Sequence, residues 1–113
     1  MKFLLDTNIV IYYLTGNKNI KEKILQNTPF SAAISDISMA ELYYGAYNST
    51  KVDENLIHVR SLSNTLSSVS FNDASQEMFG KIKVDLKQHG MRIEDFDLSI
   101  AAIALAHNLV LIT

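Results

Sequence analysis

The chain has 113 residues, of which 48% are apolar and 19% charged, a globular composition that suits one domain with one core. It has no cysteine, which excludes disulfides, zinc–thiolate sites and a cysteine nucleophile and fits the cytoplasmic location that we expect. The net charge of −2 argues against a protein that binds nucleic acid mainly through an overall positive charge. No apolar run approaches the roughly 20 residues of a membrane span.

Apolar runs and helical spacing predict strands and helices that alternate along the chain. In chain order these are a strand at Phe3–Leu5 (within residues 1–6), helices at 9–14 and 19–26, a strand at 30–35, helices at 38–47 and 51–67, a strand at 69–71, helices at 73–89 and 96–106, and a strand at 109–112. The alternation predicts an α/β fold, with a parallel sheet of about four strands and helices on both faces.

Local signals mark several ends of these elements. Thr7 or Asn8 is expected to cap the first helix and Gly16 to stop it, while Pro29 ends the second helix. The fourth strand is fully apolar, which predicts that it lies inside the sheet with helices over both faces.

Three acidic residues lie at or near a strand-to-helix junction or a helix N-terminus. Asp6 follows the first strand, Glu41 lies in the first turn of the helix after the second strand, and Asp97 opens the helix before the fourth. These ends meet at one edge of a parallel sheet, so we expect the three carboxylates to share a pocket. Clustered carboxylates repel unless a cation neutralises them, and oxygen donors without histidine or cysteine suit Mg²⁺ or Mn²⁺. Such ions promote phosphodiester cleavage.

Each acid also has a purely structural interpretation. Asp6 is a favoured cap for the first helix. Ser38 and Glu41 have the spacing of a capping box, in which Glu41 would bond the Ser38 backbone N–H. Asp97 complements a helix dipole, and Asp95 either replaces it or supports it from nearby.

Three other groups of side chains each have a structural or a functional interpretation. A basic cluster is either a solvated face or an RNA-binding surface: Lys81, Lys83, Lys87 and Arg92. Five tyrosines either pack in the core or line a groove for a partner: Tyr12, Tyr13, Tyr43, Tyr44 and Tyr47. The histidines have no metal-ligand spacing and are interpreted as structural: His58, His89 and His107.

Three segments carry a family resemblance. Residues 4–11, LLDTNIVI, resemble the opening of PIN-domain proteins, while residues 37–46 and 97–102 resemble that family's second and third motifs. The pattern covers the whole chain in order and is most similar to VapC-type toxins of bacterial toxin–antitoxin pairs.

The resemblance implies a ribonuclease that depends on Mg²⁺ or Mn²⁺, is inhibited by a cognate antitoxin and forms a homodimer. It assigns Asp6, Glu41 and Asp97 as the catalytic, metal-binding acids, with Thr7 and Asn8 supporting them. The family pattern continues past residues 109–113 into a loop with a fourth acid and a final strand, whereas this sequence ends at Thr113. We therefore expect weak binding of a single metal and reduced cleavage for residues 1–113.

Two other functions compete with this interpretation. A phosphatase of the haloacid dehalogenase type also places an Asp after an apolar strand, but it needs a second Asp two positions on, where this chain has Asn8. A PIN scaffold that binds antitoxin or dimerises without cutting RNA is the other alternative.

Overall fold

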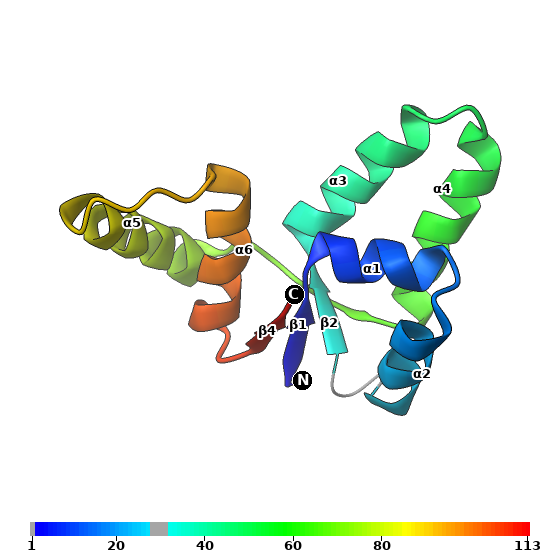
Figure 1. Ribbon diagram of the computed structural model, residues 1–113, viewed down its shortest axis with the longest axis horizontal. Helices are drawn as coiled ribbons and strands as arrows, with labels where there is room; N and C mark the ends of the chain where they lie inside the picture. Colours follow the sequence, from blue (N-terminus) through cyan, green and yellow to red (C-terminus); the bar gives the residue numbers. More distant parts are fainter. Residues whose placement is uncertain (1, 28–31) are drawn as a thin grey trace.

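The computed structural model describes residues 2–27 and 32–113 (Figure 1). The elements are β1 (Phe3–Leu5), α1 (Thr7–Leu14), α2 (Lys18–Asn27), β2 (Ala32–Ser35), α3 (Asp36–Tyr47), α4 (Val52–Ser61), the 3₁₀ turn η1 (Leu62–Asn64), β3 (Ser67–Val69), α5 (Asp73–Gln88), α6 (Asp95–Ala106) and β4 (Val110–Ile112). The predicted end of the second helix at Pro29 and the predicted start of the second strand at Phe30 lie outside the described residues.

The strands form one parallel sheet in the order β3-β2-β1-β4. This confirms the predicted α/β class. Because all strands run the same way, their carboxyl ends lie at one edge. The chain moves from β1 to β2 and β3 on one side and returns to β4 on the other, so the strand order reverses beside β1. Such a reversal is where parallel sheets open a ligand crevice.

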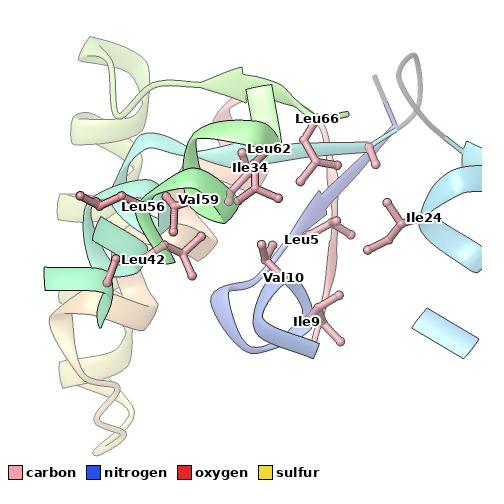
Figure 2. Close-up of a cluster of buried hydrophobic side chains, with 12 residues drawn as sticks. Leu5, Ile9, Val10, Ile24, Ile34, Leu42, Leu56, Val59, Leu62 and Leu66 are labelled. Atoms are coloured by element: carbon pink, nitrogen blue, oxygen red, sulfur yellow. The ribbon is translucent and has the colours of Figure 1, made fainter. Parts of the chain in front are cut away.

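Alternating residues of the strands pack into two hydrophobic cores, one on each face of the sheet. Leu5 and Ile34 pack with α1, α2, α3 and α4 in the larger cluster, shown in Figure 2. Leu4 and Ala33 point to the other face and pack with residues of α6. Helix α5 packs against α6, on the side away from α1 and α2 (Figure 1). The strands are therefore covered on both faces, as their near-continuous apolar runs predict.

The starts of α1 and α3 differ from the prediction. Asp6, and neither Thr7 nor Asn8, is the N-cap of α1. Helix α3 begins at Asp36 and is capped by Ser35, whose hydroxyl accepts the Ser38 backbone N–H at 3.0 Å. Ser38 is thus already inside the helix, and Glu41 lies in the second turn and not the first. The predicted capping box between these two residues is wrong.

The middle of the chain also differs from the prediction. The single helix predicted over 51–67 is divided into α4 and η1, and β3 occupies Ser67–Val69 where 69–71 was expected. Pairing with β2 sets this register, since Ser67 lies opposite Ala33 and Val69 opposite Ser35. Phe71 lies beyond the strand, with its ring 6.1 Å from that of Phe79.

Strand β4 lies at the edge of the described sheet, so its predicted interior position is wrong for this part of the chain. Val110 accordingly remains 53% exposed. Gly16 has a φ of 88°, a conformation that suits glycine, and it follows α1 as predicted. Within residues 2–27 and 32–113, no helix has the length and apolar character needed to cross a membrane.

Candidate active site

Asp6 is fixed at the carboxyl end of β1 by its own backbone and side chain. Its N–H donates to the Ile112 carbonyl at 3.0 Å, which extends the pairing between β1 and β4. Its Oδ1 accepts the Ile9 backbone N–H at 3.2 Å, so the structural role as a cap is confirmed. The residue also lines a cavity of about 340 Å³ at this edge of the sheet. Capping and ligand binding are compatible, because a carboxylate has several acceptor sites.

The structure brings the other two predicted acids to the same cavity. Glu41 reaches it from α3 and Asp97 from the first turn of α6, and both side chains are exposed to solvent. The apolar part of the described lining includes Phe96, Ile100 and Leu111. Three separate elements therefore converge at the point where the strand order reverses.

The electrostatics of this cavity are dominated by negative charge. Although Glu41 is exposed, partial desolvation of its carboxyl, then the charge of Asp97, then that of Asp6 raise its pKa above the usual value. No Lys, Arg or His is among the described residues that line the cavity. A cation would offset this repulsion, and the acidic donors are oxygens, which suit Mg²⁺ or Mn²⁺.

The carboxylates do not form a closed ligand cage as they stand. In the described part of the chain, no three Asp, Glu, His or Cys side chains are grouped closely enough to hold one metal ion. Mg²⁺ commonly keeps several water ligands and takes only one or two carboxylates directly. The donor set therefore fits an ion that is held partly through water.

The predicted supporting residues divide into two groups. Asn8 and Thr7 both line the cavity, and the buried Thr7 hydroxyl donates to Ser38 Oγ at 2.9 Å. Asp95, in contrast, forms an ion pair with Lys83 at 2.9 Å and is not among the lining residues. The structure therefore separates Asp95 from the three acids that share the cavity.

Sequence reasoning missed the part played by Ser35 and Ser38. Ser35 ends β2 next to the strand that precedes Thr7, so parallel pairing of the two strands would have placed these polar residues near each other. Ser38 was interpreted as the start of a capping box, although its side chain is fully buried against Thr7.

A second hollow of about 350 Å³ lies between α1, α3 and α4. Thr7 and Glu41 line both hollows, so this groove begins beside the acids. Tyr12 and Tyr47 remain 50% and 62% exposed, whereas Tyr43 is partly buried against the larger core. Core packing therefore holds for Tyr43, whereas no tyrosine is among the described residues that line this groove, and the predicted partner groove stays a prediction.

The histidines and the basic cluster do not line the acid cavity, although His58 lines the groove that Glu41 also lines. His89 faces Asp85, His107 contacts the Ser70 carbonyl at 3.2 Å, and none of the histidines lines the acid cavity. Lys87 and Arg92 line a separate cavity of about 450 Å³ between α5 and the start of α6. Neither forms an ion pair among the described residues.

Known proteins resemble this chain over its full length. The PIN domain profile matches residues 3–113. Ribonuclease VapC2 of Haemophilus influenzae is 33% identical, with 100% of this chain and 86% of the relative covered. The tRNA(fMet)-specific endonuclease VapC of Salmonella typhimurium is 31% identical with the same coverage. The crystal structure of VapBC2 from Rickettsia felis bound to promoter DNA superimposes with a TM-score of 0.92 at 30% identity, covering 100% of this chain and 86% of that one.

Proposed function

The chain belongs to the PIN-domain family and, within it, to the VapC proteins, and we propose that it is a metal-dependent ribonuclease that a cognate antitoxin neutralises. Relatives that match the whole chain are named ribonuclease or tRNA(fMet)-specific endonuclease. The proposed reaction is hydrolysis of an RNA phosphodiester bond.

One observation carries this proposal. Asp6, Glu41 and Asp97 come from three separate elements to line one cavity, without a cationic side chain among its described lining. Such an arrangement disfavours the metal-free state, because ionised carboxylates repel. Oxygen donors alone favour Mg²⁺ or Mn²⁺ over softer metals.

Each acid would have a distinct part in holding the ion. When bound, the ion would supply an activated water molecule and charge stabilisation for the phosphodiester oxygens. Asp6 is the most constrained ligand, because the Ile9 N–H and the β1–β4 pairing fix it. Glu41 would bind from α3, and the ion would offset the charges of Asp97 and Asp6 that raise the pKa of Glu41. Asp97 would complete the set from the opposite face of the sheet.

The proposed antitoxin site is the groove between α1, α3 and α4. Solved structures that resemble this chain are VapBC complexes, which supports a protein partner. A helical segment with apolar anchors suits such a groove, and Tyr12 and Tyr47 lie exposed on the neighbouring helices. Because Thr7 and Glu41 line both hollows, an occupant of the groove would also cover the rim of the acid cavity.

Two further parts of the proposal concern assembly and substrate. We propose a homodimer, as the family resemblance implies, and sedimentation equilibrium of the purified chain would measure it. We also propose that Lys87 and Arg92 contact RNA phosphates, since neither is paired within the described residues and both line a cavity against the start of α6.

The test is cleavage of a defined RNA by the purified chain with Mn²⁺ or Mg²⁺, with and without EDTA. We expect cleavage that EDTA abolishes. Asp97→Asn should abolish it as well, whereas Asp95→Asn, two residues away in the same turn of α6, should not. Cleavage that resists EDTA, or equal losses in both variants, would contradict the proposal.

A second candidate function is a PIN scaffold that binds antitoxin without cutting RNA. The observation in its favour is that no three acidic or histidine side chains of the described residues are grouped closely enough to hold one metal ion. Tight antitoxin binding together with no Mn²⁺ binding and no cleavage would establish this alternative.

A further inference from the structure

Three of the most deeply buried polar side chains among the described residues form one network between α1 and α3. Thr7 is 5% exposed, and Ser35 and Ser38 are both 0% exposed. Thr7 Oγ1 donates to Ser38 Oγ at 2.9 Å, and Ser35 Oγ donates to the same oxygen at 3.2 Å. The Ser38 hydroxyl therefore links the start of α1 to the start of α3.

This network lies directly behind two of the acids. Thr7 is the first residue of α1 and follows Asp6. Ser38 precedes Glu41 by three residues on α3, a spacing that puts both on one side of the helix. The Thr7–Ser38 hydrogen bond therefore directly links α1, which follows Asp6, to α3, which carries Glu41.

Stability alone does not explain why hydroxyl groups occupy these positions. Replacing both partners of a buried hydrogen bond by apolar groups of similar shape can be nearly neutral for folding. A hydrogen bond, however, holds two oxygens within a narrow range of distance, whereas an apolar contact lets helices slide. The tie also opposes the mutual repulsion of two ionised carboxylates, which would otherwise move the helix starts apart.

We propose that the Thr7–Ser38 hydrogen bond holds Asp6 and Glu41 at the spacing that binds one divalent cation, with Ser38 as the positioning residue. Ser38 is not among the residues lining the acid cavity, so it acts through Thr7 and α3. This inference rests on the proposed function, because it concerns the same metal site.

The test is calorimetric titration of the metal-free full chain with Mn²⁺, together with a thermal melt of each variant. Loss of a group that orients metal ligands typically weakens metal binding by 10- to 100-fold. We expect the double variant Thr7→Val/Ser38→Ala to bind Mn²⁺ about tenfold more weakly and to melt somewhat below the parent, because only the Ser35 hydroxyl loses its acceptor. Ser38→Ala alone should weaken binding equally and melt lower than the double variant, because it leaves the hydroxyls of both Thr7 and Ser35 without an acceptor. Thr7→Ser should keep the parent affinity, since it retains the hydroxyl.

Ser75→Ala is the matched control. Ser75 is also 0% exposed, also the third residue of its helix, and its hydroxyl donates to the capping Asn72 at 2.9 Å. This variant should melt lower and bind Mn²⁺ like the parent. Parent-like affinity in the double variant, or an equal loss in Ser75→Ala, would overturn the positioning role alone. A parent chain that binds no Mn²⁺ would instead overturn the proposed function, and the positioning role with it.

Discussion

Two substitutions at Asp6 should separate its role as a cap from its proposed role as a ligand. Its Oδ1 accepts the Ile9 N–H at 3.2 Å. Asp6→Asn keeps an oxygen that caps equally well but loses the charge, whereas Asp6→Ala loses both. A lost N-cap costs about 1 kcal/mol, which lowers the melting temperature of a domain of this size by about 4 °C. We therefore expect Asp6→Ala to melt about 4 °C lower and Asp6→Asn to melt at or above the parent, because it also removes a repulsive charge.

The assay pairs thermal melts in EDTA with RNA cleavage in Mn²⁺. Both variants should lose cleavage by about 100-fold or more, which exceeds the usual cost of removing groups outside the metal's own ligands. Asp6→Asn with parental cleavage would refute the ligand role. A melting temperature several degrees lower for Asp6→Asn would refute the claim that its amide replaces the cap.

Three further predictions concern Glu41, the tyrosines and the basic residues. Because the pKa of Glu41 is raised in the folded state, the free energy of unfolding falls as pH rises from 4.5 through that raised pKa. Glu41→Gln should therefore melt above the parent at pH 7 and level with it at pH 4, as measured by calorimetry in EDTA. Tyr47→Ala should weaken antitoxin binding by about fivefold to tenfold in a calorimetric titration and leave the melt unchanged, whereas Tyr43→Ala should lower the melting temperature, because Tyr43 packs on the core. Lys87→Ala and Arg92→Ala should each reduce the slope of log affinity for RNA against log salt by about 0.7, and an unchanged slope would identify them as a solvated surface.

Strong apolar patterns made most of the fold predictable from the sequence. The runs that became β1 and β4 are bounded by polar residues, and the alternation of strands and helices requires parallel connections. The ends of α1 and α3 were harder, because several capping residues stand close together. Ser35 and Ser38 both suit a cap, but Ser35 is the cap, and the Ser38 hydroxyl instead bonds Thr7, 31 residues away in the chain.

Long-range pairing also explains the errors in the middle of the chain. Ser67 and Ser68 carry no strand signal of their own, yet they pair with Ala33 and Ile34 in the parallel sheet. For the candidate site, the shared cavity could be predicted because Asp6 follows β1, Glu41 lies on the helix after β2 and Asp97 opens the helix before β4. The ion pair between Asp95 and Lys83 could not be predicted, because it depends on how α5 packs against α6.

The most direct test of the central claim is the Mn²⁺ affinity of single variants, measured by calorimetric titration at pH 7. The claim is that Asp6, Glu41 and Asp97 together bind a divalent cation. It predicts one Mn²⁺ per parent chain and a large loss of affinity in each of Asp6→Asn, Glu41→Gln and Asp97→Asn, with parental affinity in Asp95→Asn. Parental affinity in all three variants, or a loss in Asp95→Asn equal to that in Asp97→Asn, would contradict it.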